Sequence, residues 1–394
     1  MQSQTFQRFW IFSIAAGLAI GNLYIAQPLL IDISKSLSVG TGQVGLLATL
    51  IQIGYAAGTI LLSPLGDILP RKKLVPLFMS IAGLGLMAAG ISEIYFLLAL
   101  ALTAIGFTTI SGQMLIALTG DISDPEHRGK NLGVVVSGIV TGILISRTLS
   151  GAIEGLLGWH GSFLVFGSMN ILVGLVLYRL IPVLPSKPKV SYLKLIGDVF
   201  VIPARNWTLS LNLLMNATGF AMFSALWTSM TFLLSEKPFG FNATTIGLFG
   251  LVGVIGAMVA QPVGRLYDKG KADVALVLAF IGYLVSYILG SFVFTSIAFL
   301  IAQLLLLDAA GQVNNLMNQS RILSKYAHAR ARVNASYVAS NFVGGAVGTW
   351  AAATLWPVGG WLLIQHISIV LSAVLLIGWM ILGKTKIIEN SKVR

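Results

Sequence analysis

The hydrophobic and polar positions of this 394-residue chain alternate on a long scale. Apolar runs of roughly 18 to 25 residues, each able to cross about 30 Å of hydrocarbon as a helix, are separated by short polar breaks. Twelve such runs lie near 9–31, 43–65, 74–92, 94–117, 131–153, 162–181, 207–233, 244–263, 273–292, 294–317, 333–355 and 361–383. The pattern predicts an all-α membrane protein with twelve transmembrane helices.

Short motifs in the breaks recur about half a chain length apart. The recurring pairs are Pro64-Leu65-Gly66 with Pro262-Val263-Gly264, Arg128 with Arg330, and Gly158-Trp159 with Gly360-Trp361. The repetition indicates a duplicated six-helix unit and predicts two pseudo-symmetric halves, 1–181 and 207–394, joined by a linker at 182–206. Two such halves can rock around a site at their interface, which is a physical basis of secondary transport.

The composition supports a membrane protein. The chain is 56% hydrophobic and 10% charged with a mean hydropathy of +0.88, whereas soluble domains are about 25% charged. A net charge of +12 would suggest nucleic acid in a soluble chain, but in this chain the position of each cation matters more. Because the chain has no cysteine, it has no disulfides or thiolate metal sites.

The basic residues predict the orientation of the helices. All 25 Lys and Arg residues except Lys35, Lys237 and Arg147 fall in alternate breaks, at both termini and in the linker. Cytoplasmic loops carry the excess of Lys and Arg, so we expect both termini and the linker to be cytoplasmic.

Two breaks carry an aspartate followed by cations. Residues 63–73 read Ser-Pro-Leu-Gly-Asp-Ile-Leu-Pro-Arg-Lys-Lys, and 264–271 read Gly-Arg-Leu-Tyr-Asp-Lys-Gly-Lys. Asp67, Arg71 and Asp268 could latch one conformation by pairing with neighbouring helices; the alternative is an ordinary positive-inside loop. Both breaks resemble the Gly-x-x-x-Asp-Arg-x-Gly-Arg-Arg signature of the major facilitator superfamily, from which Ser63, Ile68 and Pro70 depart.

Further segments resemble the bacterial arabinose-efflux-like and drug:proton antiporter branch of that superfamily. They are 22–30, the pair Gln52 and Tyr55, 147–151 and 341–348. Two features depart from it: the fourth run lacks the arginine of many proton-coupled antiporters, and the fifth-run signature Gly-x-x-x-Gly-Pro-x-x-Gly-Gly is reduced to Gly138-x-x-x-Gly142. The resemblance therefore supports transport more firmly than drug–proton exchange.

Charges inside the apolar runs are functional candidates because burying them is costly. Arg147 lies in the outer third of the fifth run, where it could attract an anionic group, pair with Asp32 or Glu154 as an outer gate, or simply snorkel outward. Asp308 lies in the tenth run, where it could carry a proton through the cycle or make a structural hydrogen bond. The proton-coupling candidates are thus Asp308, Arg147, Asp32 and Glu154.

Neutral polar and aromatic side chains in the runs could line a central cavity, although such residues also pack helices together. A cavity of this composition fits an amphipathic or weakly charged organic solute. The candidates are Asn22, Tyr24, Gln27, Gln52, Tyr55, Asn212, Asn216, Phe220, Phe223, Trp227, Gln303, Tyr337 and Asn341.

Closely spaced glycines mark helix faces that can approach tightly. They lie at Gly54 and Gly58, Gly138 and Gly142, Gly247 to Gly256, and Gly344 to Gly348. In the superfamily the corresponding helices form the moving interface, so the resemblance implies that the two halves meet at these glycines.

No enzymatic motif is found. The chain lacks a Gly-x-x-x-x-Gly-Lys-Ser/Thr loop, and its histidines, His127, His160, His328 and His366, are scattered. We expect no enzyme, cofactor, metal or nucleic-acid partner. The expected function is proton-coupled efflux of a small organic solute by alternating access, by a monomer in the bacterial inner membrane. Proton-coupled import of a nutrient, or a lipid flippase or non-transporting protein of the same fold, are the alternatives.

The predicted orientation can be tested with single cysteines. We expect Ser186→Cys and Ser324→Cys to be shielded from an impermeant thiol reagent in intact cells and Ser235→Cys to react, because the first two lie in the breaks that carry the excess of Lys and Arg and Ser235 does not. The cysteine-free chain is itself the control. Labelling of Ser186→Cys from outside would overturn the assignment.

Overall fold

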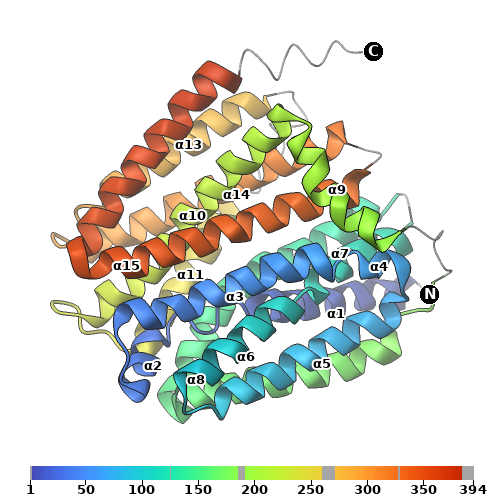
Figure 1. Cartoon of the computed structure of the whole chain (residues 1–394), viewed down its shortest axis with the longest axis horizontal. Helices are drawn as coiled ribbons and strands as arrows, with labels where there is room; N and C mark the ends of the chain where they lie inside the picture. Colours follow the sequence, from blue (N-terminus) through green and yellow to red (C-terminus); the bar gives the residue numbers. More distant parts are fainter. Residues whose placement is uncertain (1, 125, 185–190, 260–270, 327–328, 384–394) are drawn as a thin grey trace. The chain divides into compact units, whose positions relative to one another are not determined.

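The computed structural model describes residues 2–124, 126–184, 191–259, 271–326 and 329–383 (Figure 1). Within these residues the chain forms helices joined by turns and contains no strand. The α-helices are α1 (Gln2–Gly21), α2 (Leu30–Leu37), α3 (Thr41–Leu61), α4 (Leu65–Ile68), α5 (Arg71–Gly90), α6 (Tyr95–Thr108), α7 (Ser111–Ile122), α8 (Arg128–Leu180), α9 (Tyr192–Ala204), α10 (Trp207–Ser235), α11 (Ala243–Val259), α13 (Ala272–Gly290), α14 (Ile297–Lys325) and α15 (Arg330–Gly378), followed by a π-helical turn at Trp379–Gly383.

The described helices account for twelve membrane spans. Eight helical stretches are long and apolar enough to cross a bilayer, and shorter apolar stretches lie at Arg8–Gly21 and Ala243–Gly253. Two of the eight, α8 with 53 residues and α15 with 49, each fold back on themselves at an internal kink and supply two spans. The predicted all-α, twelve-helix architecture is confirmed.

Both kinks lie at the repeated Gly-Trp motif. Gly158 has φ 69° and Gly360 has φ 55°, in the left-handed region that glycine tolerates best. The tryptophan that follows each glycine is buried, and the indole Nε1 of Trp361 donates to the carbonyl of Gly290 at 2.7 Å. The repeat therefore marks the hairpin between the last two spans of each half.

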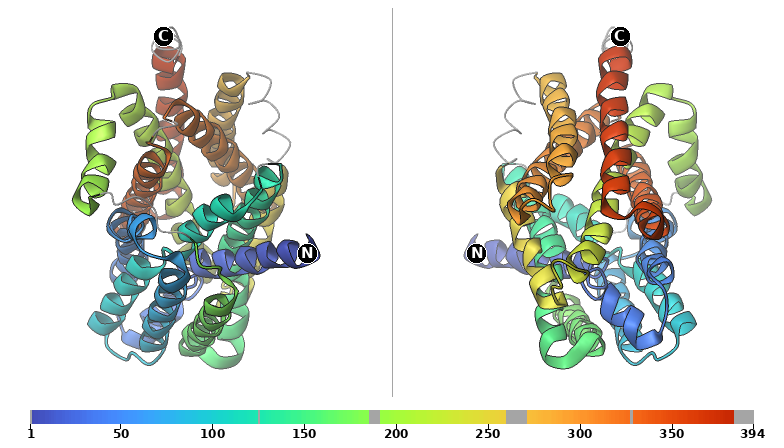
Figure 2. Two further views of the ribbon diagram at one scale, coloured as in Figure 1. Left: turned by 90° about the vertical axis from the view of Figure 1, so that its right-hand side faces the viewer. Right: turned by 90° about the vertical axis from the view of Figure 1, so that its left-hand side faces the viewer.

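The chain groups into two compact units. The first contains Met1–Gly197 and Leu234–Leu251, and the second contains Asp198–Leu233 and Val252–Arg394. In the first unit α5 and α1 pack along α8, and α3 packs along α6. In the second, α13 packs along α14 and α15; the pairs α5–α8 and α13–α14 can be followed in Figures 1 and 2.

The segment expected to be a linker, 182–206, contains helix α9. In the first unit the hydroxyl of Tyr192, at the start of α9, donates to the carbonyl of Leu61 at 2.6 Å. In the second unit Asp198 pairs with Arg332, and Ser336 donates to the carbonyl of Val199 at 2.7 Å. The start and the middle of α9 are thus held by side-chain contacts.

The first apolar run is not one continuous helix. Helix α1 ends at Gly21, and residues 22–29 form successive turns before α2 begins. Their backbone amides bond three residues back, as Tyr24 N does to Gly21 O at 2.9 Å. Irregular backbone at membrane depth is tolerated where protein buries it or where it lines a cavity, and most of these residues are fully buried.

The first and fifth spans of each half touch backbone to backbone. A Cβ atom on Gly142 would lie 2.3 Å from the carbonyl oxygen of Gly17, and one on Gly138 would lie 2.4 Å from that of Ser13. In the second half a Cβ on Gly344 would lie 2.2 Å from the carbonyl oxygen of Ala217. Only glycine allows such an approach, so the duplication has kept the same helix contact in both halves.

This packing corrects the expected role of most of the closely spaced glycines. The backbones nearest to Gly54 and Gly58 are those of Thr103 and Phe107 in the same half. Gly138, Gly142, Gly344 and Gly348 likewise pack within their own halves. Among the closely spaced glycines whose neighbours the structure describes, Gly247 and Gly250 on α11 touch the other half, at Leu144 to Thr148 of α8, inside the first unit. Sequence spacing alone could not distinguish contacts within a half from contacts between halves.

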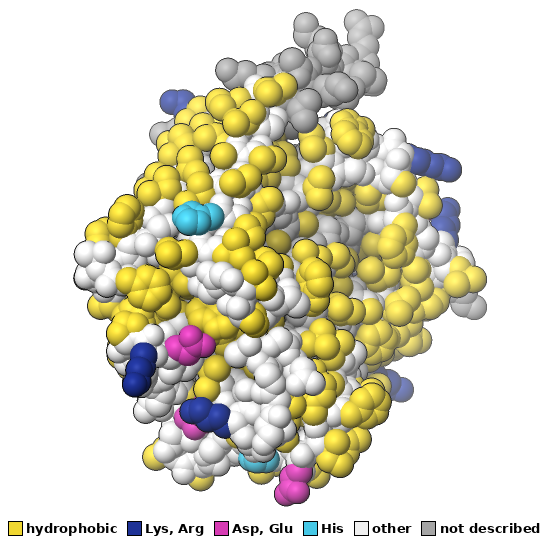
Figure 3. All heavy atoms as spheres, turned by 60° about the vertical axis from the view of Figure 1, so that its left-hand side comes forward, with side chains coloured by type: hydrophobic (Ala, Val, Ile, Leu, Met, Phe, Trp, Pro, Cys, Tyr) yellow, Lys and Arg dark blue, Asp and Glu magenta, His cyan; other side chains and the backbone are white. Residues whose placement is uncertain are grey.

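Large apolar side chains lie exposed on the helices. Phe96 is 71% exposed, Leu172 63% and Leu278 57%. Figure 3 shows one face, on which hydrophobic side chains form large continuous areas between sparse charged ones. Such exposure is expected of a surface that faces lipid.

The close contact at Gly142 predicts that alanine, which normally favours a helix more than glycine does, destabilises the protein at this position. Gly142→Ala should lower stability by about 1–3 kcal/mol, because the new methyl group overlaps the Gly17 carbonyl. Gly378→Ala is the matched control: a Cβ there meets nothing within 4 Å, so the better helix propensity of alanine should leave stability unchanged or raised. Thermal unfolding in detergent measures both. Equal stability of the two variants would contradict the close contact.

Candidate functional site

A buried arginine organises the polar contacts in one part of the first unit. Arg147, on α8, is 1% exposed. Its Nε donates to Oε1 of Gln27 at 2.7 Å, its Nη1 donates to the carbonyl of Ile143 at 3.0 Å, and its guanidinium lies 4.5 Å from the ring centroid of Tyr24. The side chain does not snorkel outward. Its cation is held in place on an aromatic face, where it could attract an anionic group.

Arg147 also adjoins the contact between α8 and α11. The hydroxyl of Thr148 donates to the carbonyl of Gly247 at 2.7 Å, and that of Thr244 donates to the carbonyl of Gly151 at 2.8 Å. These two bonds point in opposite directions across the same pair of helices. The arginine is therefore positioned where the two sequence halves touch within the first unit.

Other predicted cavity residues of the first unit pair with one another or with the backbone. The amides of Asn22 and Asn170 each donate to the other at 2.9 Å, which ties the turn segment to the last span of α8. The Tyr55 hydroxyl accepts from Gln113 at 3.3 Å, and Gln52 donates to a carbonyl one turn earlier. All three predicted residues are buried. The Asn22–Asn170 pair is of the kind that hydrogen-bonds neighbouring membrane segments to each other.

Asp32 and Glu154 lie near each other in the first unit. Burial raises the pKa of the Asp32 carboxyl, and the nearby Lys35 ammonium and the backbone of Asp32 itself oppose the shift. The charges of Asp32 and Lys35 also act on Glu154. The two carboxylates and the lysine thus form one electrostatically linked group.

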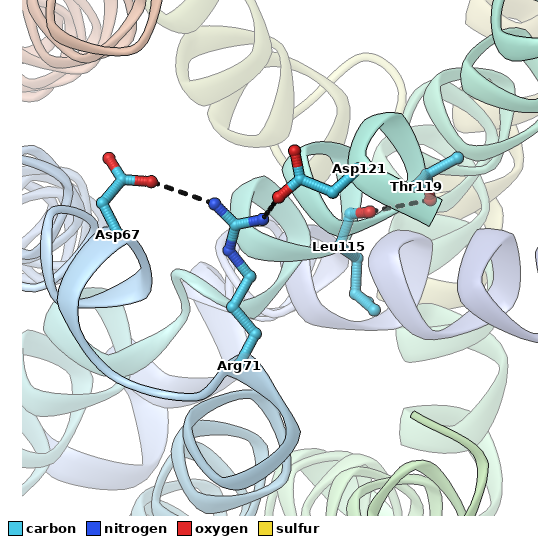
Figure 4. A network of polar contacts seen from close by, with 5 residues as sticks. All are labelled: Asp67, Arg71, Leu115, Thr119 and Asp121. Atoms are coloured by element: carbon cyan, nitrogen blue, oxygen red, sulfur yellow. Dashed lines mark hydrogen bonds and ion pairs between the residues drawn. The ribbon is translucent and has the colours of Figure 1, made fainter. Parts of the chain in front are cut away.

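The loop after the second span holds a three-residue charge network. Arg71, at the start of α5, is buried; its Nη2 lies 3.0 Å from Oδ1 of Asp67 and its Nη1 lies 2.5 Å from Oδ2 of Asp121 (Figure 4). Asp121 ends α7, where Thr119 donates to the carbonyl of Leu115 at 2.8 Å. The guanidinium therefore links α4, α5 and α7.

The second half has a counterpart of this network with the charges exchanged. Asp273, at the start of α13, pairs with Arg321 near the end of α14 at 2.7 Å. Asp273 begins the third span of the second half and Arg321 lies near the end of its fourth, as Arg71 and Asp121 do in the first half. An ion pair joins the same two spans in each half, although its polarity is reversed. The third predicted latch residue, Asp268, lies outside the described residues.

A chain of amides crosses the second unit. Asn318 donates to Asn314 at 2.8 Å, and Asn314 donates to Asn216 at 2.9 Å. Asn216 in turn donates to Asn341. All four are buried, and they join α14, α10 and α15.

The hydroxyl of Tyr337, on α15, donates to the carbonyl of Asn315 on α14 at 3.1 Å. The structure thus brings three predicted cavity residues, Asn216, Asn341 and Tyr337, to the same part of the second unit.

Aromatic rings continue this surface along α10. Phe220 stacks on Phe223 with centroids 5.6 Å apart, and Phe223 lies 6.2 Å from Trp227. Phe220 also contacts Phe342 on α15 at 5.1 Å, next to Asn341 in the sequence. Amides and rings thus lie side by side, an arrangement that can bind a solute carrying both polar groups and apolar faces.

Asp308 is the only fully buried acidic side chain among the described residues and is 5% exposed. It lies on α14, about 17 Å along the helix axis from Ile297. Its charge acts on the hydroxyls of Tyr283 and Tyr287 on α13, and the Tyr283 hydroxyl is bonded to Asn314. The carboxylate therefore acts electrostatically on a tyrosine that is hydrogen-bonded to the chain of amides.

Two predicted residues lie apart from this group. Gln303 donates to Oε1 of Gln365 at 2.7 Å, near the Gly290 contact with Trp361. Asn212 donates to the carbonyl of Thr208 within its own helix. Their described contacts are structural.

Sequence reasoning missed several partners. Asp121, Asn170 and Asn318 were not singled out, although each completes a network described above. The available signal for Asn170 was a polar residue within an apolar run. For Asp121 the signal was a third charge that falls in a cytoplasmic break, like the charges of the loop signature. Within the described residues no group of three or more His, Cys, Asp or Glu side chains could hold a metal ion.

Comparison with known proteins identifies the family. The Major Facilitator Superfamily profile matches residues 12–349. The chain is 36% identical to the uncharacterized transporter YgaY of Escherichia coli O157:H7, over 89% of each chain. It is 25% identical to a probable sugar efflux transporter of Helicobacter pylori, over 68% of this chain and 69% of the relative.

A solved structure of the nucleoside transporter NupG has a TM-score of 0.78 at 12% identity and covers 95% of this chain and 98% of that one. At this identity the likeness concerns the fold alone. The family profile and the relatives of higher identity carry the assignment. The chain belongs to the Major Facilitator Superfamily of membrane transporters.

Proposed function

We propose that this transporter exports a small amphipathic or weakly charged organic solute and couples export to protons. The observation that carries the coupling is Asp308, a fully buried carboxylate within a helix that crosses the membrane. Burying a charge at this depth is costly, so such residues are retained for function. Protonation from one side and release to the other would let the proton gradient drive the cycle.

The contacts of the second unit support a neutral or weakly charged solute. The amides of Asn216 and Asn341 and the rings of Phe220 and Phe342 form one continuous group. Amides bind hydroxyl groups, and aromatic faces stack on the apolar faces of rings. Because a Helicobacter pylori relative is named as a probable sugar efflux transporter, sugars are the first solutes to screen.

In the proposed cycle the halves 1–181 and 207–394 move against each other around the linker 182–206, in a monomer of the bacterial inner membrane with both termini cytoplasmic. The bonds between α8 and α11 beside Arg147 belong to one end state and break in the other. Asp67 and Arg71 stabilise one state from the cytoplasmic loop. Such exchange around a central site is the general mechanism of transporters built from repeats.

Asp308→Asn tests the coupling. This variant is permanently neutral at the carboxyl position, so it should lose accumulation driven by an imposed proton gradient in proteoliposomes while retaining solute binding and downhill exchange. Asp124→Asn, an exposed aspartate in a loop, is the control and should transport normally. If Asp308→Asn still concentrates solute against its gradient, the coupling group lies elsewhere, with Asp32, Glu154 and Arg147 next to test. Gradient-driven uptake into cells would instead identify an importer.

Asp67→Asn tests the loop latch. The side chains of Asp67 and Asp121 are 33% and 36% exposed, so the lost pair is worth on the order of 1 kcal/mol, and transport should fall about fivefold if the paired state is needed in the cycle. Expression and solute binding should be unchanged. A wild-type transport rate would mean that the loop only orients the chain in the membrane.

A further inference from the structure

A groove runs along the first unit between α1 and α8. Its volume is about 650 Å³, which lies within the range typical of small-molecule sites. Trp10 and Lys130 line one end, and Leu149 and Phe166 line the other. Apart from Lys130 and several hydroxyl groups, the lining is apolar.

The groove exists because small residues lie where the two helices touch. Gly17, Gly138 and Gly142 bring the backbones together and form the floor. Gly133 is exposed, and a Cβ atom there would meet nothing within 4 Å. The hollow is therefore bounded by backbone and is not filled by side chains of the unit itself.

The walls consist of exposed apolar side chains. Trp10 is 52% exposed, Ile14 64% and Ile145 42%. In a chain that spans a membrane these groups contact hydrocarbon. From Lys130 to Leu149 the helix rises about 29 Å at 1.5 Å per residue, close to the roughly 30 Å thickness of the bilayer core. An extended acyl chain fits along this path.

One end of the groove is basic. Lys130 lines it, and Arg128 lies one turn or less away on the same helix, exposed. Helices α1 and α8 run parallel, since Ser13 bonds to Val134 and Gly17 contacts Gly138. The same register places the exposed Arg8 level with Gly129. Lys130 and Trp10 therefore share this end of the lining, with Arg128 and Arg8 at the same level of the two helices. Tryptophan is a residue type that favours the lipid headgroup level.

We propose that this groove binds an anionic phospholipid, with an acyl chain along α1 and α8 and the headgroup phosphate against Lys130. The apolar hollow explains the acyl chain, and Lys130 at the basic end of the groove explains the choice of an anionic headgroup. The groove is lined by residues of α1 and α8 only, and none of them is a residue assigned to the solute or to the proton.

The test measures quenching of Trp10 fluorescence by lipids brominated on the acyl chain. The Trp10 signal is the difference between the wild type and Trp10→Phe in bilayers that contain brominated phosphatidylglycerol or brominated phosphatidylcholine. We expect half-maximal quenching at about a fivefold lower fraction of phosphatidylglycerol, since each cation near the surface attracts anionic lipid. Lys130→Gln should remove most of this preference, whereas Lys73→Gln, an exposed lysine on α5, should keep it.

Filling the groove separates a bound lipid from lipid that merely surrounds the protein. Gly133→Leu should weaken quenching by both lipids, and Ser137→Leu, also in the groove lining, should do the same. Gly129→Leu, whose new side chain also meets open space but does not line the groove, should have no effect. Equal quenching by the two lipids in the wild type, or quenching unchanged by both filling variants, would overturn the proposal.

Discussion

The contact between the first and fifth spans of each half is the constraint on which the rest of the structure depends. At Gly17 with Gly142, and at Ala217 with Gly344, one helix backbone rests on the other without side chains between them. Lipid tails are as apolar as the side chains, so no hydrophobic driving force brings membrane helices together. Close packing of this kind must therefore hold them together. With the first and fifth spans fixed, the turn segment 22–29 and Arg147 are brought together in the first half. In the second half the same contact brings Asn216 to Asn341.

Few charged side chains are buried between these helices. Among the described residues the buried charged side chains are Arg71, Arg147 and Asp308. Arg71 is paired with two carboxylates, Arg147 lies on the ring of Tyr24, and the charge of Asp308 acts on the hydroxyls of two tyrosines. The loop pair is repeated in the second half as Asp273 and Arg321 with its signs exchanged. The duplication has therefore preserved the bridge between two spans while the residues that form it have changed.

Hydropathy predicted the helices well because a bilayer imposes one length and one composition on every span. The repeated Gly-Trp motif predicted that the two halves would match, and both copies fold into the same hairpin. The break after Gly21 could not be predicted, because an apolar run reads the same whether it is helical or turned. The partners of the glycines and asparagines also escaped prediction, since spacing shows which face is small or polar but not what it meets. Asn170 pairs with Asn22, 148 residues away.

The central claim is that each half is held rigid by its first-to-fifth span contact, while the contact between α8 and α11 opens and closes. The cysteine-free chain allows paired spin labels at exposed positions, and the distance between them is the most direct measurement. One pair, at Ser36 and Leu156, lies within the first half, and the other, at Leu156 and Asn242, reports on α8 against α11. Between acidic and alkaline pH we predict a second distance population for the Leu156–Asn242 pair and a single unchanged distance for the Ser36–Leu156 pair. A change in the Ser36–Leu156 distance, or one fixed Leu156–Asn242 distance in a protein that transports, would contradict the account.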